Sequence, residues 1–510
     1  MPSPATPIKR YALTSENRKR DAAPDLSADE FRRLGNALVE QIAQFLETLP
    51  ERPVTRAHTP AEIRSLMGTD ELPDSGTAPD ALLRETAELL FDHSLHNGHP
   101  RFFAYITSSA APLGALCDLL ASAVNSNVGG WDIAPMASEI EAQTIRWLAQ
   151  LIGYSPDCGG LMVSGGNMAN IVCFFAARRS KAPWEIRAEG VGAGDRTLVC
   201  YTSKSTHTWI QKAADLSGLG TNQIRWIETD EMQRIDPSAL RDRIKADRDE
   251  GLLPFLIVAT AGTVSTGAVD PLDELAGIAA EHDLWFHVDG AYGAFGAALP
   301  DASADLKAIS KADSVALDPH KWLYSPLEAG CAIVRDPKNL TDAFLYMPEY
   351  YHFVDDDEDP RINYYQYGFQ NSRGFRALKV WLGLRHVGRD GYVQLLQDDI
   401  ALAERIFASA TAHPELEAIS RELSITTFRY KPEDVESGDA SAETYLNQLN
   451  DELLYRLNET GEIFLSNAVI DGRNVLRTCI VNFRTDVADV DVIPEVVVRV
   501  GRAVDAEFRS

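Results

Sequence analysis

The sequence is poor in cysteine, and its cysteines form no pattern that would build a metal site or a disulfide framework. Six cysteines are scattered along 510 residues, and no two of them form a CxxC pair. This spacing argues against disulfide bonds and structural zinc, and it is typical of proteins from a reducing compartment. We therefore predict a cytoplasmic protein that holds no metal ion.

Long apolar runs and an excess of positive charge are also missing. The longest apolar stretches, such as residues 252–261, are far shorter than the roughly 20 residues that cross a bilayer. The first residues carry prolines and charges instead of the apolar core of a secretion signal. The formal net charge of −27 disfavours anionic partners, which need clustered Lys and Arg. We expect neither a membrane nor a nucleic acid as a partner.

Hydrophobic residues make up 45% of the chain, and their spacing predicts an α/β fold. Between about residues 100 and 390, apolar strands alternate with amphipathic helices. This alternation predicts a mostly parallel sheet that helices cover on both faces, with ligands at the carboxyl ends of the strands. The clearest strands are residues 256–261, 284–288, 314–317 and 331–334.

The regions on either side of this alternation differ from it. Ser27 and Glu30 have the spacing of a capping box, and apolar residues follow at helical steps as far as Pro50. After Tyr392 the pattern predicts helix, strand, helix, hairpin and helix, with the hairpin turn at Asp471-Gly472. We therefore predict a disordered tail (1–25), an N-terminal helical segment (26–100), a large α/β domain (101–392) and a small α+β domain (393–510). The acidic tract 355–359 is expected to be an exposed, mobile loop.

Two polar residues at predicted strand ends indicate a cofactor site. Lys321 follows the strand 313–317 within the sequence Asp-Pro-His-Lys-Trp, and Asp289 follows the strand 284–288. A cofactor that stabilises carbanions needs an amine that bonds its aldehyde and a carboxylate that keeps its pyridine nitrogen protonated. Either residue alone could be a helix cap or a solvated loop residue. Together they predict a site for pyridoxal 5′-phosphate (PLP).

A glycine-rich turn and a histidine fit the same prediction. Residues 164–170 contain Gly165 and Gly166 between an apolar strand and an apolar helix, which is a suitable cradle for a phosphate group. His207 stands at another apparent junction between a strand and a helix. A single histidine in such a place is more often structural than catalytic.

With these residues in place, the chain resembles the PLP-dependent amino acid decarboxylases of the aromatic-L-amino-acid, tyrosine and glutamate decarboxylase group. The resemblance covers about residues 30 to 485. It implies the aspartate aminotransferase type of fold, fold type I of the PLP-dependent enzymes, and a homodimer with a shared active site and N-terminal helices wrapped over the partner. The motifs that carry it are residues 99–105, 139–141, 164–170, 207–214, 259–263, 287–292 and 318–322.

The resemblance also implies roles for single residues. Lys321 would bond the cofactor, Asp289 would pair with its ring nitrogen, and His207 would stack on one ring face while Ala291 packs the other. Gly165, Gly166 and Asn167 would hold the phosphate. Further cofactor contacts implied in this way come from Thr263 near the ring hydroxyl and from Asp318 and His320 near the phosphate and the lysine.

A tyrosine is expected to decide the reaction. Tyr350 matches the loop tyrosine that reprotonates the substrate α-carbon in this family, although neighbouring Tyr351 leaves the register open by one residue. Relatives with phenylalanine there release aldehydes, so tyrosine favours decarboxylation of an amino acid to an amine. The catalytic residues implied are Lys321, His207, Tyr350 and Asp289.

The resemblance places the substrate side chain among six residues: Tyr105, Ile106, Ser108, Gly129, Trp131 and Ser372. Gly129 and Trp131 belong to a segment that would be donated across the dimer. Gly129 is expected to leave room for a large side chain such as indole, whereas Ser372 points to phenolic substrates. We therefore predict an aromatic L-amino acid, with tyrosine, dihydroxyphenylalanine, phenylalanine and tryptophan all open. The alternatives are a glutamate or 2,4-diaminobutyrate decarboxylase, an aromatic aldehyde synthase, a carbon-carbon lyase and a non-catalytic scaffold.

Overall fold

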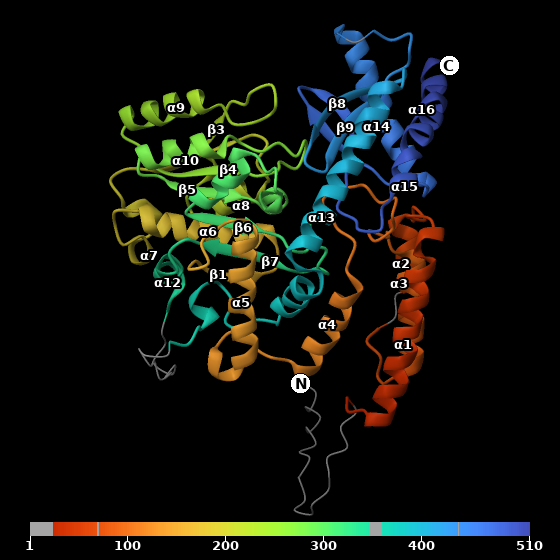
Figure 1. The fold of residues 1–510 in the computed structure, drawn as a ribbon, viewed down its shortest axis with the longest axis horizontal. Helices are drawn as coiled ribbons and strands as arrows, with labels where there is room; N and C mark the ends of the chain where they lie inside the picture. Colours follow the sequence, from red (N-terminus) through yellow and green to blue (C-terminus); the bar gives the residue numbers. More distant parts are fainter. Residues whose placement is uncertain (1–23, 69–70, 347–359, 437) are drawn as a thin grey trace, which may run out of the picture. The chain divides into compact units, whose positions relative to one another are not determined.

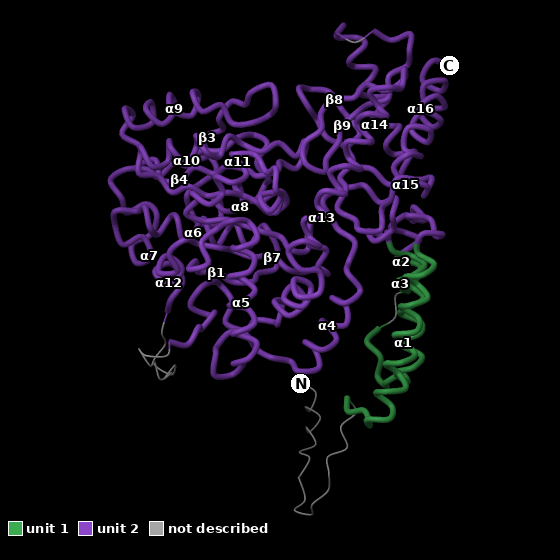
Figure 2. The backbone as a smooth tube through the Cα atoms, in the orientation of Figure 1, with its two compact units in different colours: residues 1–49, 64–94 green, residues 50–63, 95–510 purple. Residues whose placement is uncertain are grey.

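A computed structural model describes residues 24–68, 71–346, 360–436 and 438–510. The chain forms two compact units, one of residues 1–49 and 64–94 and one of residues 50–63 and 95–510 (Figure 2). Most of the tail predicted to be disordered, the acidic tract 355–359, Tyr350 and Tyr351 lie outside the described residues. Within the described residues, no helix combines the length and apolarity of a membrane span.

The first unit is built on two helices, α1 (Ala28–Thr48) and α3 (Pro79–His93). The predicted capping box begins α1: the backbone N–H of Glu30 donates to Ser27 Oγ at 3.3 Å, and the N–H of Ser27 donates to Glu30 Oε2 at 3.2 Å. Phe45 and Phe91 stack with their ring centroids 4.5 Å apart, which joins the two helices through an apolar contact.

The second unit contains a sheet of seven strands in the order β1-β7-β6-β5-β4-β2-β3 (Figure 1). The strands from β3 to β6 are parallel, as the alternation predicts. β7 runs antiparallel to β6 and to β1, because the short segment between β6 and β7 contains no crossover helix. The bounds are β1 Gly159–Val163, β2 Leu198–Ser203, β3 Ile224–Ile227, β4 Leu253–Thr260, β5 Trp285–Asp289, β6 Ser314–Leu317 and β7 Gly330–Val334.

Helices cover this sheet, and its strands are almost fully buried. The helix α6 (Gly166–Lys181) packs against β5, β6 and β7, while α9 (Pro237–Asp249) and α10 (Leu272–Glu281) pack against β3, β4 and β5. The core of the unit lies between these layers. The other helices around the sheet are α4 Pro112–Val124, α5 Pro135–Leu151, α7 Ile186–Glu189, α8 Trp209–Leu216, α11 Ala304–Lys307 and α12 Lys338–Phe344; α2 is Pro60–Met67.

The C-terminal part carries a second sheet, which is antiparallel and has the order β10-β11-β9-β8. The predicted hairpin is present: Asp471 and Gly472 both have positive φ, which is the backbone of a tight hairpin turn. Two strands, β8 and β9, form a hairpin where the sequence predicted one strand. The bounds are β8 Leu416–Glu422, β9 Ile425–Tyr430, β10 Ser466–Ile470, β11 Arg473–Cys479, α14 Ala440–Thr460, α15 Val487–Asp491 and α16 Ile493–Arg509.

The helix α13 (Ala377–Ala412) connects the two sheets. It is kinked at Gly388, where φ is 71° and ψ is 170°. Its first part packs on α4 and α5, and its end packs on β8 and β9. α13 therefore passes through residue 392, the domain boundary expected from the sequence, and it brings its own side chains close to the end of β6.

Candidate active site

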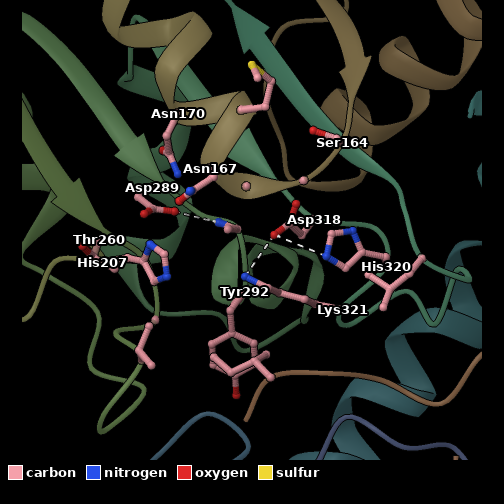
Figure 3. A pocket seen from close by; sticks show the side chains of 18 of the residues that line it. Ser164, Asn167, Asn170, His207, Thr260, Asp289, Tyr292, Asp318, His320 and Lys321 are labelled. Carbon is pink, nitrogen blue, oxygen red and sulfur yellow. Dashed lines mark hydrogen bonds and ion pairs between the residues drawn. The ribbon is translucent and has the colours of Figure 1, made fainter. Parts of the chain in front are cut away.

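A cavity of about 280 Å³ lies at the carboxyl ends of the strands of the large sheet (Figure 3). Six chain segments line it: five lie at the ends of the strands β1, β2, β4, β5 and β6, and the sixth contributes Ile106 from the stretch before α4. This is the edge at which open α/β sheets bind ligands. The lining residues are Ile106, Ser164, Gly165, Gly166, Asn167, Met168, Asn170, Ser205, His207, Thr260, Gly262, Val264, Asp289, Ala291, Tyr292, Asp318, His320, Lys321 and Leu327.

The predicted lysine reaches this cavity from the turn after β6. Lys321 Nζ lies 3.0 Å from Asp318 Oδ2, and His320 Nε2 lies 3.7 Å from the same oxygen. The other ring nitrogen of His320 contacts the backbone of Ala329. Burial lowers the pKa of His320, so its imidazole is mostly neutral at neutral pH. The turn thus presents an amine, a carboxylate and an imidazole together.

The turn that carries the lysine is anchored from α13. Asp399 Oδ2 accepts hydrogen bonds from Trp322 Nε1 at 2.8 Å and from the Tyr324 hydroxyl at 2.7 Å. The hydroxyl of Tyr392, also on α13, donates to the carbonyl of Leu323 at 3.3 Å. Three consecutive residues after Lys321 are therefore held by one helix.

Asp289 and His207 face the cavity from neighbouring strand ends. Asp289 ends β5, and its Oδ2 accepts a hydrogen bond from Trp209 Nε1 at 2.7 Å. His207 precedes α8, and its Nδ1 accepts from the backbone N–H of Trp209 at 3.3 Å. Burial lowers the pKa of His207, which leaves a neutral ring beside the carboxylate. The structure therefore brings the three central predicted residues, Lys321, Asp289 and His207, to one cavity.

The glycine-rich turn joins β1 to α6, as predicted. Gly165 has φ 142°, a conformation that favours glycine, and α6 begins at Gly166. A Cβ atom at Gly166 would lie 2.7 Å from Asp318 Oδ2, so any side chain there would force the Asp318 carboxylate to move. The start of α6 directs backbone N–H groups and a partial positive charge at the cavity, which suits a phosphate group.

The residues present fit a polar cofactor such as PLP. Asn167, Thr260 and Asp318 line the cavity, and each has a buried side-chain oxygen without a hydrogen-bond partner in the described structure. Buried polar atoms are rarely left unsatisfied in native proteins. A bound group with its own polar atoms would satisfy them.

Some predicted cofactor and substrate residues lie elsewhere. Thr263 is buried beside the cavity, and its hydroxyl is engaged with the Thr266 hydroxyl at 2.9 Å. The Ser108 hydroxyl donates to the carbonyl of His320 at 2.7 Å, so Ser108 supports the lysine turn from behind. Tyr105 is 57% exposed and does not line the cavity. Of the six predicted substrate residues, only Ile106 does so.

Within this chain, the absence of a side chain at Gly129 opens no space; the expected room for a large substrate side chain, in a pocket shared across the dimer, stays a prediction. A Cβ atom at Gly129 would lie 1.9 Å from the carbonyl oxygen of Asn371. The backbone N–H of Gly129 also donates to Asn127 Oδ1 at 3.2 Å. Glycine is required here because two backbone segments approach each other, and the space is already filled.

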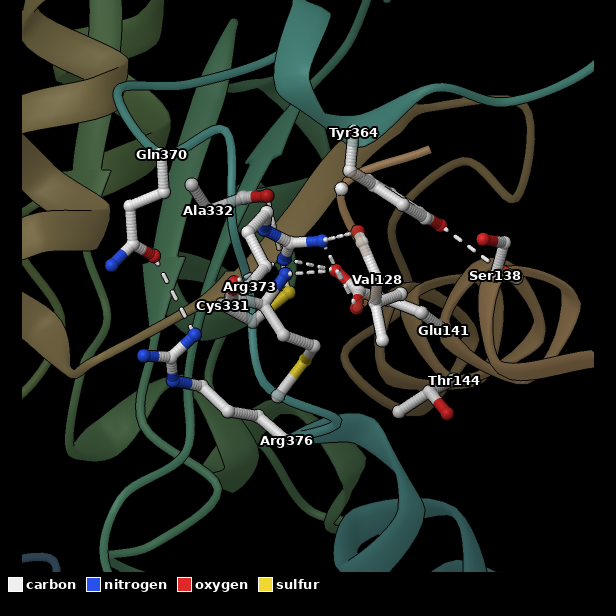
Figure 4. Close-up of polar contacts among 12 residues, drawn as sticks. Val128, Ser138, Glu141, Thr144, Cys331, Ala332, Tyr364, Gln370, Arg373 and Arg376 are labelled. Carbon is white, nitrogen blue, oxygen red and sulfur yellow. Dashed lines mark hydrogen bonds and ion pairs between the residues drawn. The ribbon is translucent and has the colours of Figure 1, made fainter. Parts of the chain in front are cut away.

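Trp131 and Ser372 lie in the two chain segments that approach each other at Gly129 and Asn371. Trp131 Nε1 donates to Glu139 Oε1 at 2.8 Å, and Ser372 is exposed next to the buried Arg373. Arg373 donates to Glu141 Oε1 at 2.5 Å and to the carbonyls of Met162 and Val128 at 2.6 and 2.8 Å (Figure 4). The segment that contains Ser372 is thereby tied to α5 and to β1.

Several residues at the cavity were not singled out from the sequence. Thr260 ends β4, so the rule that placed Asp289 at a strand end would also have found it. Asn170 and Trp209 lie inside motifs that were recognised, but their side chains were given no role. Val264 and Leu327 carry no signal in the sequence, because apolar loop residues are common and their approach to the cavity depends on the fold.

Comparison with known proteins gives consistent matches. The family described as pyridoxal-dependent decarboxylase conserved domain matches residues 60–431. An aromatic-L-amino-acid decarboxylase of Bacillus atrophaeus is 36% identical over 461 residues, which cover 90% of this chain and 93% of that protein.

Solved structures are similar over nearly the whole chain. Oryza sativa TDC, solved with PLP and tryptamine, has a TM-score of 0.86 and 28% identity, and the match covers 94% of this chain and 99% of that one. A 4-hydroxyphenylacetaldehyde synthase of Rhodiola rosea has a TM-score of 0.83 and 27% identity, with the same coverage of 94% and 99%. These likenesses confirm the predicted fold class.

Proposed function

This chain belongs to the pyridoxal-dependent decarboxylase family, and on this premise we propose that it converts an aromatic L-amino acid to the corresponding amine and carbon dioxide. Family membership confirms the predicted enzyme class, a PLP-dependent carboxy-lyase, and a free amino acid as its substrate is consistent with the family. The observation that carries the proposal is the gathering of Lys321, Asp289 and His207 around one cavity.

Lys321 is the residue that would hold the cofactor covalently. Its Nζ atom lies at the cavity wall, and the Asp318 carboxylate 3.0 Å away can take up or return a proton when the amine changes its bonding. Ser108 and Asp399 hold the backbone and the following residues of the turn. The amine is thereby kept in place while substrates exchange.

Bound PLP supplies a ring that delocalises the electron pair left on the substrate when carbon dioxide departs. Asp289 would hold a proton at the ring nitrogen, which a buried carboxylate does well. His207 offers a flat, neutral surface for one ring face, and Ala291 is small enough to pack the other. These residues orient the ring without adding a second charge to it.

The phosphate group would lie at the start of α6. Gly165, Gly166 and Asn167 offer backbone N–H groups there, and His320 stands at the same wall. We assign the contact with the ring hydroxyl to Thr260 instead of Thr263, because Thr260 Oγ1 faces no partner in the described structure whereas the hydroxyl of Thr263 is already bonded.

An aromatic substrate fits the other cavity walls. Ile106, Val264, Leu327 and the ring of Tyr292 provide apolar surface, and no arginine occurs among the described lining residues. A side-chain carboxylate such as that of glutamate would have to be buried there without a free cationic partner, which costs several kcal/mol. The relative from Bacillus atrophaeus supports the same substrate class.

The last step, protonation of the substrate α-carbon, is proposed for Tyr350 on the basis of the sequence resemblance. Tyr350 lies outside the described residues. If Tyr350 acts as this acid, its replacement by phenylalanine should divert the reaction toward oxidation by molecular oxygen, which gives aldehyde, ammonia, peroxide and carbon dioxide. The same change at Tyr351 serves as the control for the register.

A substrate panel tests the reaction. The purified protein with PLP is incubated with tyrosine, dihydroxyphenylalanine, phenylalanine, tryptophan, glutamate and 2,4-diaminobutyrate, and carbon dioxide, amine and peroxide are measured. We expect equal amounts of carbon dioxide and an aromatic amine. Peroxide with aldehyde would identify an aldehyde synthase, and turnover of glutamate or 2,4-diaminobutyrate alone would refute the aromatic assignment.

A lysine variant tests the cofactor anchor. Lys321→Ala should lose the visible absorption of the bound cofactor and more than about 100-fold of the activity, because no other amine lines the described cavity wall. Lys338→Ala is the control, since Lys338 is an exposed lysine that pairs with Asp342. An unchanged spectrum for Lys321→Ala would contradict the assignment.

We also propose that the enzyme is a homodimer. The apolar residues Leu116, Leu119, Leu120 and Val124 of α4 are each more than half exposed in the single chain. Contiguous apolar surface of this kind marks an interface. Leu116→Glu combined with Leu120→Glu should give monomers in sedimentation experiments, whereas Val469→Glu on an exposed hairpin should not. A monomeric parent protein would refute the proposal.

A cytoplasmic location remains our proposal as well. All six cysteines are free, and five of them are buried. This is the state expected of a protein from a reducing compartment.

A further inference from the structure

Trp209 makes two contacts that join the residues on either side of the proposed cofactor ring. Its indole Nε1–H donates to Asp289 Oδ2 at 2.7 Å, and its backbone N–H donates to His207 Nδ1 at 3.3 Å. The remaining carboxylate oxygen of Asp289 accepts from the backbone N–H of Ala291 at 3.2 Å. Among the described residues, Asp289 has neutral hydrogen-bond donors and no ion pair.

The indole ring of Trp209 is held by its buried surroundings. Trp209 is fully buried at the start of α8, and its ring meets the ring of His287 edge to face, with centroids 5.7 Å apart and planes at 87°. His287 is fixed in turn, because Nδ1 contacts Ser314 Oγ at 2.8 Å and Nε2 contacts Asn170 Oδ1 at 2.7 Å. Burial lowers the pKa of His287 to about 4, so this neighbour is neutral.

These contacts have a chemical consequence for Asp289. A hydrogen bond from a neutral donor to a carboxylate stabilises the ionised form and fixes the carboxylate rotamer. The water-poor surroundings strengthen that effect. The same residue makes Nδ1 of His207 an acceptor, which selects the neutral tautomer with hydrogen on Nε2.

We propose that Trp209 is a positioning residue for Asp289 and His207, and that its indole N–H holds the Asp289 carboxylate in the orientation that faces the ring nitrogen of PLP. This inference rests on the proposed function, because it assumes that Asp289 faces that nitrogen. It adds a residue whose side chain need not touch the cofactor. The titratable groups that face Asp289 are His207 from the α8 side, Lys321 and Asp318 from the β6 turn, His287 on β5 and Cys173 on α6.

The test is Trp209→Phe, which keeps an aromatic ring and removes the N–H donor. PLP is titrated into the cofactor-free protein, and kcat and KM are measured on the reconstituted enzyme. We expect PLP to bind about tenfold more weakly or worse, which is the effect of one lost hydrogen bond to a charged group. kcat should fall with little change in KM.

Trp381→Phe is the matched control. Trp381 Nε1 donates to Gln143 Oε1 at 2.7 Å, so this change also removes a partly buried indole donor, but away from the cavity. It should leave PLP affinity, kcat and KM unchanged. If Trp209→Phe lowers PLP affinity but the reconstituted enzyme keeps the kcat of the parent, Trp209 has only a packing role and the proposal is overturned. Unchanged affinity would overturn it as well.

A second measurement leaves Trp209 unchanged. It therefore tests the proposal even if Trp209→Phe does not fold. The full-length protein is labelled with ¹⁵N at its indole nitrogens, and the indole spectra of the parent and of Asp289→Ala are compared. One strongly downfield N–H resonance should move upfield in Asp289→Ala. If no indole resonance responds, the hydrogen bond does not exist in solution. Failure of the proposed function gives another result: Lys321→Ala would then keep the visible absorption of the bound cofactor and the activity.

Discussion

Asp399 is a buried carboxylic acid that holds the Lys321 turn without an ion pair in the described structure. Its Oδ2 accepts from two neutral donors, Trp322 Nε1 and the Tyr324 hydroxyl. Burial raises the pKa of Asp399 from 3.8 to about 7, and the nearby Asp398 adds to the shift. A residue that anchors the turn of Lys321, the proposed cofactor lysine, therefore changes its charge near neutral pH.

This shift predicts how stability depends on pH. Between about pH 4 and pH 7 the folded protein keeps a proton on Asp399 that the unfolded chain has lost, so stability falls as pH rises through this range. The slope is about 1.4 kcal/mol per pH unit for one proton. Asp399→Asn keeps a carbonyl acceptor and removes the titration. We therefore expect the variant to gain stability over the parent between about pH 5 and pH 8, as measured by urea unfolding.

Asp270 has a pKa that burial raises in the same direction, also to about 7. The relevant quantity is therefore the difference between Asp399→Asn and the parent, in which the contribution of Asp270 cancels. Parallel pH profiles for the two proteins would contradict the prediction.

Gly129 and Gly130 offer a second test with single residues. A Cβ at Gly129 would meet the Asn371 carbonyl at 1.9 Å, whereas the nearest atom to a Cβ at Gly130 is Asn363 Oδ1 at 3.6 Å. Gly129→Ala should therefore lower the free energy of unfolding by about 1–3 kcal/mol, the usual cost of overpacking. Gly130→Ala should cost clearly less in the same thermal or urea unfolding experiment. Equal effects would show that the two backbone segments are not in close contact.

The residues of the site differ in how far the sequence could predict them. Lys321, Asp289 and the glycine turn stand directly after apolar strands, and parallel strands bring their carboxyl ends to one edge. Thr260 obeys the same rule and could have been predicted. The close approach at Gly129 could not, because it depends on Asn371, a residue distant in the sequence that no local pattern connects to it.

At the level of elements, the deviations from the prediction occur where local patterns are weak. Residues 416–422 mix apolar and charged side chains, and the turn after them uses Leu423 with φ 49° in place of the expected glycine or asparagine. The hairpin β8–β9 was therefore predicted as one strand. The direction of β7 was not predictable from its composition, because an apolar strand reads the same in both directions.

The pair of Arg373 and Glu141 predicts how the segment before α13 is held. Both side chains are almost fully buried, and Arg373 also bonds two backbone carbonyls. Arg373→Met should destabilise the protein by about 3–5 kcal/mol, because it leaves a buried carboxylate unpaired. Arg376→Met is the control, since Arg376 pairs with the half-exposed Glu328 and should cost less than about 1 kcal/mol. The comparison is made by urea unfolding, and similar losses would contradict it.

At the scale of the whole molecule, the fold class and the enzyme family were predictable, since both depend on many ordered motifs along the chain. The division into parts was harder, because α13 runs through residue 392 and connects both sheets. Periodicity identifies a helix but does not tell which sheet it serves. The substrate side chain is the least predictable feature: within this chain only Ile106 of the six expected contacts lines the cavity, and Gly129 and Trp131 were expected from across the dimer.

Net charge predicts the behaviour of the proposed dimer. Each chain carries a formal charge of −27, so two chains repel each other, and salt screens this repulsion. Self-association should therefore strengthen when the ionic strength rises from about 0.01 M to about 0.15 M. Sedimentation at a series of protein concentrations measures this change. Weaker association at the higher ionic strength would indicate that ion pairs across the interface dominate instead.

The antiparallel β7 has a consequence for the order of folding. Every other pair of neighbouring strands from β2 to β6 is joined through a long crossover, whereas β6 and β7 pair across the short segment that contains Lys321. Pairing of nearby segments loses less loop-closure entropy than pairing of distant ones. We therefore expect Lys321 to acquire its backbone conformation early, before Asp289 and His207 are placed by strands that depend on distant contacts. The cofactor would then meet a preformed anchor whose surrounding walls assemble last.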